Sequence, residues 1–172
     1  MRISKLVVAL LVLGCAPLSF GQDVHVDWDK HATFERYHTY CWGKVQTSNP
    51  LWKNRIQDAV DKDLQAKGWQ RVDSHSDATI FAVGSTQNQQ EYQTFYNGLG
   101  GGWRWGGFAQ STTTVENYRV GTLVVDLYDS NNRELLFRGT ASDSLSSDPD
   151  KNERKLEKAV DKMFKKFPPE KE

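Results

Sequence analysis

The chain has 172 residues, and its 22 Lys and Arg balance its 22 Asp and Glu to give a formal net charge of zero. A nucleic-acid-binding domain carries an excess of basic residues, so this balance argues against nucleic acid as a partner. The length suits one domain with a modest core once an N-terminal leader is set aside.

The first residues predict a secretory signal peptide. Arg2 and Lys5 precede an apolar run from Leu6 to Leu13, and small and turn-forming residues follow. The run is shorter than the roughly 20 apolar residues that a membrane-spanning helix needs. We therefore expect the protein to be exported, with residues 1–21 as the signal peptide and residues 22–172 as a single domain.

Two ways of processing this leader are open. Ser19 and Gly21 place small residues at the −3 and −1 positions of a cleavage site, and cleavage there releases a soluble chain that begins at Gln22. The segment Val12-Leu13-Gly14-Cys15 resembles a lipobox, whose cysteine, Cys15, is acylated and anchors the protein to a membrane. The second residue of this segment is bulkier than the motif usually carries. We therefore favour periplasmic release over an outer-membrane lipoprotein.

The first half of the remaining chain carries strand and helix patterns in turn. A two-residue apolar period predicts a strand over 23–28, residues 29–37 are expected to form a loop or one helical turn, and β-prone residues predict a strand over 39–42. An apolar spacing of three and four residues after Pro50 then predicts an amphipathic helix that ends at Gly68.

The second half predicts three more strands and a second helix. A strand is expected over 78–86, and a two-residue period around the turn Ser130-Asn131-Asn132 predicts an antiparallel hairpin over 121–142. A cap and first-turn proline at Asp148-Pro149 open an amphipathic helix that stops at Pro168-Pro169. Residues 87–119 lie between the strand over 78–86 and the hairpin over 121–142. They are too irregular for a helix and too long for an ordinary loop, which indicates an extended excursion such as a long hairpin.

These elements predict an α/β fold of the α+β type. About five strands and two amphipathic helices are most simply arranged as a two-layer sandwich, with both helices packed on one face of a mixed, mostly antiparallel sheet. Each helix has one apolar stripe, so neither is expected to be covered on both sides.

The 87–119 excursion also contains a candidate binding surface. Trp103, Trp105 and Phe108 lie on a glycine-rich backbone, and Tyr96 precedes them. The rings either fold back to plug one end of the core or stay exposed as an anchor for an envelope partner, which would be a protein, a glycan or a membrane surface. A third alternative is that the segment has no fixed structure.

No catalytic residue, cofactor site or metal site is recognisable from motifs. A phosphate-binding loop would need glycine at His38, and a dinucleotide fingerprint would need glycine at Trp103. The histidines lack the spacing of zinc ligands. Because Cys15 is either removed with the signal peptide or acylated, Cys41 has no cysteine with which to form an intrachain disulfide, and we expect it to be buried. The rival hypothesis is an enzyme whose polar residues, for instance His25, His38 and Asp126, converge only in the folded chain.

A series of short motifs resembles the bacterial family called domain of unknown function 4136. The motifs are, in chain order, Asp27-Trp28-Asp29, Phe34 to Tyr37, Thr39 to Trp42, Leu64 to Gly68, Gly121 to Asp126, Arg138 to Ala141 and Phe167 to Pro169. Phe137 stands where the family often has tryptophan. The resemblance implies an α/β envelope protein, frequently a lipoprotein, and brings no catalytic residue. We therefore expect a non-catalytic envelope module that uses the 87–119 excursion.

Overall fold

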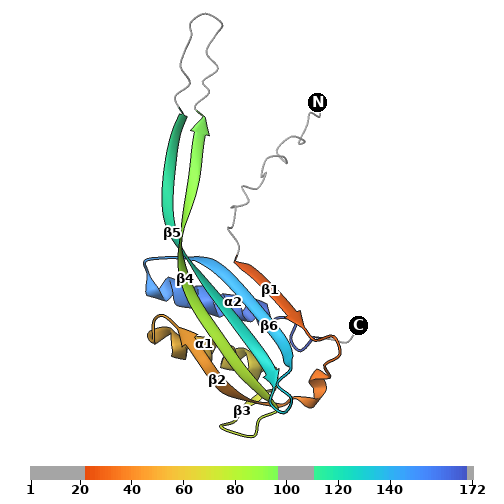
Figure 1. Cartoon of the computed structure of the whole chain (residues 1–172). Helices are drawn as coiled ribbons and strands as arrows, with labels where there is room; N and C mark the ends of the chain where they lie inside the picture. Colours follow the sequence, from red (N-terminus) through yellow and green to blue (C-terminus); the bar gives the residue numbers. More distant parts are fainter. Residues whose placement is uncertain (1–21, 97–110, 170–172) are drawn as a thin grey trace, which may run out of the picture.

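The computed structural model describes residues 22–96 and 111–169, with backbone alone for 90–96 and 111–117 (Figure 1). Its elements are β1 (Asp23–Trp28), the 3-10 turn η1 (Phe34–Arg36), β2 (Thr39–Thr47), α1 (Leu51–Ala66), β3 (Gln70–Arg71), β4 (Ala78–Tyr96), β5 (Ser111–Asp129), β6 (Leu135–Leu145) and α2 (Pro149–Phe164).

The strands form one mixed sheet of six, in the order β1-β6-β5-β4-β2-β3. β2 runs parallel to both β3 and β4, and the other neighbouring strands are antiparallel. Both helices lie on one face of the sheet (Figure 1). The predicted α+β two-layer sandwich is confirmed, with six strands where about five were expected. The additional strand, β3, has two residues, which is too short to leave an alternating pattern in the sequence.

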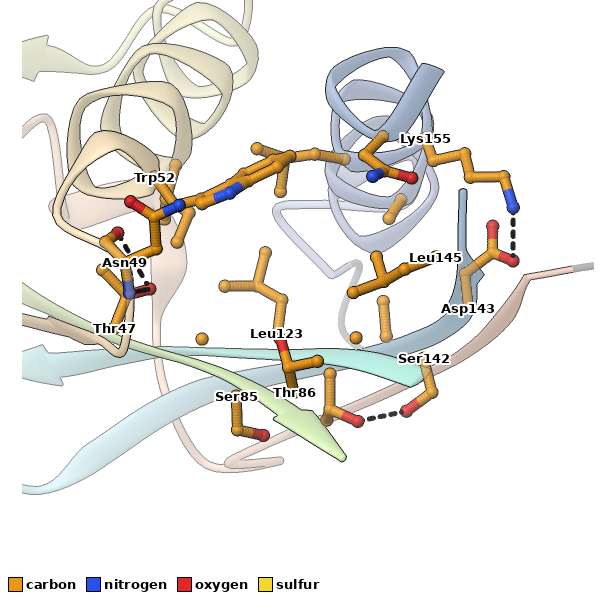
Figure 2. Close-up of a pocket in the computed structure, with 18 of the residues that line it drawn as sticks. Thr47, Asn49, Trp52, Ser85, Thr86, Leu123, Ser142, Asp143, Leu145 and Lys155 are labelled. Carbon is orange, nitrogen blue, oxygen red and sulfur yellow. Dashed lines mark hydrogen bonds and ion pairs between the residues drawn. The ribbon is translucent and has the colours of Figure 1, made fainter. Parts of the chain in front are cut away.

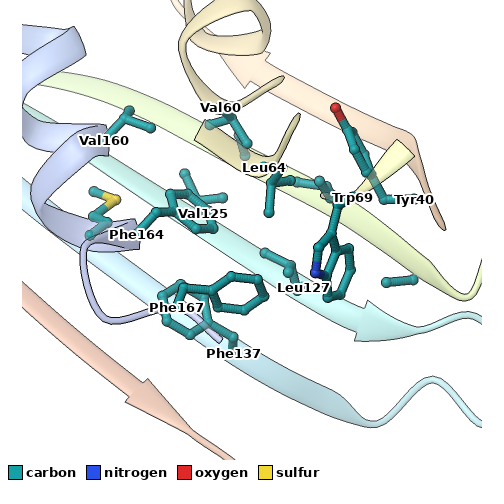
Figure 3. Packing of buried hydrophobic residues seen from close by; sticks show 14 of the residues in the cluster. Tyr40, Val60, Leu64, Trp69, Val125, Leu127, Phe137, Val160, Phe164 and Phe167 are labelled. Atoms are coloured by element: carbon teal, nitrogen blue, oxygen red, sulfur yellow. The ribbon is translucent and has the colours of Figure 1, made fainter. Parts of the chain in front are cut away.

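The core lies between the sheet and the two helices. Alternate residues of β4 and β5 point toward the helices, where Ile80, Val125 and Leu127 are fully buried. Helix residues pack onto them, among them Leu64 and Phe164, and Figure 3 shows how closely these side chains gather. The opposite face of the sheet is not covered by any described element.

An aromatic cluster closes the core at the end of α2. The Phe167 ring lies 5.6 Å from Phe34, 5.3 Å from Trp69 and 5.2 Å from Phe137, measured between ring centroids. Such pairs each stabilise a fold by about 0.5–1.5 kcal/mol beyond their buried area. The Phe-Pro-Pro motif after α2 therefore serves the packing of the core.

Both helix starts and the end of α1 lie close to where the sequence predicts them, whereas α2 ends at Phe164, four residues before Pro168. The Asn49 side-chain oxygen accepts the Leu51 N–H (3.1 Å) at the start of α1, and Gly68 follows its end with φ of +85°. The Asp148 carboxylate accepts the N–H groups of Asp150 (2.9 Å) and Lys151 (3.3 Å) at the start of α2. Neither of these helices, nor any other helix in the described part of the chain, is long and apolar enough to cross a membrane.

The prediction of a buried Cys41 is wrong. Its neighbours Tyr40 and Trp42 take the helix-covered side of β2, so the alternation of the strand turns Cys41 to the open face. There it is partly exposed, with its Sγ 3.7 Å from the Thr79 hydroxyl oxygen.

Candidate binding site at the base of an extended arm

The central hairpin extends well beyond the body of the sheet. β4 pairs with β5 over its whole length, from Ala78 opposite Asp129 to Tyr96 opposite Ser111. β2 stops pairing with β4 at Gly84, and β6 reaches β5 only as far as Arg119. Residues 89–96 and 111–118 therefore form a two-stranded ribbon, named here the arm, that projects from the domain (Figure 1). At 3.4 Å per residue the arm is roughly 25 Å long.

Both edges of the arm are unpaired in the described part of the chain. An unpaired edge presents a row of backbone N–H and C=O groups to any strand that approaches it. Natural edge strands are commonly protected by lysine or proline, and the arm contains neither. At its base the Tyr118 hydroxyl donates a hydrogen bond to Gln89 Oε1 (3.1 Å), which ties the two strands together.

The arm accounts for the long hairpin expected within residues 87–119. Tyr96 is the last residue of β4, opposite Ser111. The other predicted binding residues, Trp103, Trp105 and Phe108, and the predicted lipidation residue Cys15 lie outside the described residues. The aromatic binding surface therefore stays a prediction.

A groove of about 350 Å³ opens where the arm leaves the body. It lies between the first turns of α1 and α2 and the sheet below them (Figure 2). Trp52 and Ile56 line it from α1, and Leu156 lines it from α2. Its lining is therefore apolar on the helix side, and Leu123 and Leu145 continue that character on the sheet.

Two glycines of the sheet let side chains of the groove lining pack closely against the strands. A Cβ atom on Gly121 would lie 2.9 Å from Leu145 Cδ2, and one on Gly84 would lie 3.2 Å from Ile56 Cδ1. Both distances are shorter than an ordinary van der Waals contact, so a larger residue at either position would need the neighbouring side chain to move. No motif marks this site in the sequence, because its lining comes together from five separate parts of the chain.

The rim of the groove is polar. Lys155 Nζ donates to Asp143 Oδ1 (3.1 Å) and to the Ser144 carbonyl (2.7 Å), which neutralises that part of the rim. Arg119, on the opposite strand, is exposed and forms no ion pair with a described residue. Among the described lining residues, the groove therefore combines apolar walls with one positive charge that has no ion-pair partner.

A second, polar hollow of about 390 Å³ lies at the other end of the sheet. There the Tyr37 hydroxyl donates to Asp129 Oδ2 (2.7 Å), while the Asn131 and Asn132 N–H groups bond to Asp129 Oδ1 (2.7 and 3.3 Å). Burial alone would raise the pKa of Asp129, but these donors and Arg36 outweigh burial and lower it. Because both carboxylate oxygens are occupied, this cluster holds the β5–β6 turn against η1.

The residues of the enzyme hypothesis line neither hollow. His25 is exposed on edge strand β1 and lies 3.0 Å from Asp23, while the His38 N–H donates to Asp77 (2.9 Å). Asp126 lies on the open face, where Arg138 Nε and Nη2 each donate to it at 2.7 Å. Within the described ranges no three His, Cys, Asp or Glu residues are placed to hold a metal ion.

Comparison with known proteins identifies the family. Residues 24–169 match the model of the family described as Domain of unknown function (DUF4136). The chain belongs to this family. DUF4136 is the family that the short sequence motifs resemble, so that prediction is confirmed. No curated protein sequence matches the chain.

Solved structures share the fold of this DUF4136 chain. A PDZ domain protein from Parabacteroides distasonis matches with a TM-score of 0.58 and 13% identity over 88% of this chain and 37% of that longer one. The PelC dodecamer from Paraburkholderia phytofirmans matches with a TM-score of 0.52 and 11% identity over 84% of this chain and 95% of the PelC chain. At such identities the likeness concerns the fold alone.

Proposed function

We propose that this DUF4136 protein is an exported, non-catalytic module of the bacterial envelope that binds a partner polypeptide through the arm. The observation that carries the proposal is the arm itself, which has two unpaired edges beyond the reach of β2 and β6 within the described chain. A partner strand that adds to an exposed edge gains a row of backbone hydrogen bonds, which is a common mode of peptide recognition.

The energetics of a two-stranded ribbon support a binding role for the arm. An isolated hairpin of two strands is at best marginally stable in water, because neither face is covered. Neither strand of the arm has a further neighbour among the described strands, so pairing with a partner would add the backbone bonds and buried area that it lacks.

A second copy of the chain is the first partner to test. The PelC chain that shares this fold forms a dodecamer, as its description states. Two arms that meet edge to edge would form a continuous sheet between copies. Analytical ultracentrifugation of the purified protein distinguishes self-association from binding to another envelope protein.

The deciding experiment shortens the arm without touching the core. Residues 90–117 are replaced by Asn-Gly, which joins Gln89 to Tyr118 through a two-residue hairpin turn. We expect this variant to keep the melting temperature of the full chain and to lose both self-association and co-purification with envelope proteins. Unchanged association in the shortened chain would refute the proposal.

A second variant separates the strands of the arm from the segment that joins them in the sequence. Deleting residues 98–108 removes Trp103, Trp105 and Phe108 and leaves both strands complete. Loss of binding in this variant would assign the contact to the deleted aromatic segment. Retained binding would assign the contact to the strand edges.

Export is tested by the mass of the mature protein purified from its native cells. Cleavage after Gly21 gives a soluble chain beginning at Gln22, whereas lipidation gives an acylated chain beginning at Cys15. We expect the soluble form. A full-length mass that retains Met1 in the cytoplasm would contradict export.

A further inference from the structure

We propose that the groove at the base of the arm binds a single-chain anionic lipid, with the aliphatic chain between the helices and the sheet and the head group at Arg119. This inference does not depend on the function of the arm, because the residues that line the groove lie outside the arm.

The interior of the groove suits an aliphatic chain. Its volume of about 350 Å³ falls within the range of small-molecule sites, which is about 300–1,000 Å³. Trp52 and Ile56 line this space from α1, and Leu156 and Ala159 line it from α2. Figure 2 shows the Trp52 ring reaching from α1 toward α2 above the sheet. Gly121 and Gly84 carry no side chain that would add bulk to the sheet side of this space.

The rim favours a negatively charged head group. The charged residues that line the groove are Arg119, Asp143 and Lys155, and the last two pair with each other at 3.1 Å. This pairing leaves Arg119 as the one uncompensated charge among these described lining residues. A carboxylate at the end of an aliphatic chain would complement it.

A peptide fits this groove less well than a lipid. A peptide backbone would need hydrogen-bond partners along its length, because an unpaired buried amide is costly. The Asn152 side chain is already engaged with the N–H and the carbonyl of Ser146 (each 2.8 Å), and the open backbone edge of β4 begins only after Gly84. An aliphatic chain makes no such demand.

Trp52 provides an intrinsic probe for the test. Dibromostearate, a fatty acid whose bromine atoms quench nearby indole fluorescence, is titrated into the full chain below its micellar concentration. We expect saturable quenching with one molecule per chain, and we expect Trp52→Phe to remove most of it. Absent or non-saturable quenching, or quenching unchanged by Trp52→Phe, would overturn the proposal.

Charge at the rim is tested with a matched pair of ligands. Arg119→Glu is an exposed substitution and should leave folding intact. We expect it to weaken dibromostearate binding by about three- to tenfold, as expected for a surface charge contact, and to leave binding of the neutral methyl ester unchanged. Equal affinities of wild type and Arg119→Glu for the acid would show that the head group does not lie at Arg119.

Chain length and filling of the groove provide two further readouts. Across saturated fatty acids that compete with the probe, affinity should rise about fourfold per methylene until the groove is full and then level off. Gly121→Leu should abolish competition while circular dichroism shows a folded protein.

The chain shortened at 90–117 keeps Arg119 and should bind as wild type does, which separates this inference from the function of the arm. An affinity independent of chain length would contradict the proposal.

Discussion

Asp61 is the polar residue that fixes α1 to the edge of the sheet. Its Oδ1 accepts the Tyr40 hydroxyl and the Trp42 indole N–H, each at 2.8 Å, and its Oδ2 accepts Arg71 Nη1, also at 2.8 Å. Asp61 is buried, and the burial of Tyr40 together with this carboxylate raises the pKa of the Tyr40 hydroxyl. One carboxylate thus joins β2, β3 and α1.

Removing this carboxylate should destabilise the fold. We expect Asp61→Ala to lower the free energy of unfolding by about 2–4 kcal/mol, because the buried Tyr40 hydroxyl and the Trp42 indole both lose their acceptor. Urea denaturation followed by tryptophan fluorescence measures the change. Asp58→Ala, an exposed substitution on the same helix, is the control and should stay within about 0.5 kcal/mol of wild type.

For single residues, the sequence predicts roles that depend on neighbours in the chain, but it does not predict partners that are distant in the chain. Gly68 and Asp148 were identifiable because a helix cap involves neighbours in the chain. The bond from Tyr37 to Asp129 was not, since 92 residues separate the two side chains. For the same reason no pattern around Arg119 indicates that the fold places it at the rim of the groove.

Among the elements, α2 has the most complete local signal. Asp148 caps it, Pro149 occupies its first turn, and its apolar face packs on β6 with Val160 and Phe164 fully buried. The cap satisfies two N–H groups that would otherwise lack a partner at the helix start.

The contribution of the cap can be measured directly. We expect Asp148→Ala to lower the free energy of unfolding by about 1 kcal/mol, because the first-turn N–H groups of α2 lose their acceptor. Lys158→Ala, an exposed change in the middle of the same helix, should have a much smaller effect. Thermal unfolding by circular dichroism compares the two variants, and equal losses would show that the cap contributes nothing.

The strands were predicted best where one face is buried. The apolar alternation of β4 predicted a strand only as far as Thr86, although the strand continues to Tyr96. Beyond the body of the sheet no described layer covers the arm, so no side of it needs apolar residues and the two-residue period disappears. β2 likewise continues to Thr47, past a register shift between Trp42 and Val45 that interrupts its pattern.

For the molecule as a whole, carboxylates with a lowered pKa connect stability to acidity. The His38 N–H is the largest cause of the lowered pKa of Asp77, whereas at Asp129 burial acts to raise the pKa and hydrogen bonds overcome it. Both pKa values lie below the ordinary aspartate value in the folded protein. The stability that these groups contribute is therefore complete above the unfolded pKa and is lost as pH falls through the folded one.

Thermal stability should therefore decline in acid. We expect the melting temperature to hold between about pH 7 and 5 and to fall below about pH 4. Asp77→Asn should lower the melting temperature at neutral pH and reduce the decline of the melting temperature in acid. Asp63 has a pKa raised mainly by burial, so its protonation in acid adds a small amount of stability to the folded state. Asp63→Asn should remove this gain in stability. An equal decline of the melting temperature in acid for wild type and Asp77→Asn would contradict this role of Asp77.

The pairing of β1 with β6 bears on the order in which the molecule is completed. Asp23 lies opposite Ser142, so the first strand finds its only neighbour among the described strands near the end of the chain. Contacts between such distant segments form late and slow the folding of a domain. A chain that enters an export channel from its N-terminus would thus emerge with β1 unpaired, and its sheet would close only after nearly all of it had crossed. The topology itself would delay folding until translocation is almost finished.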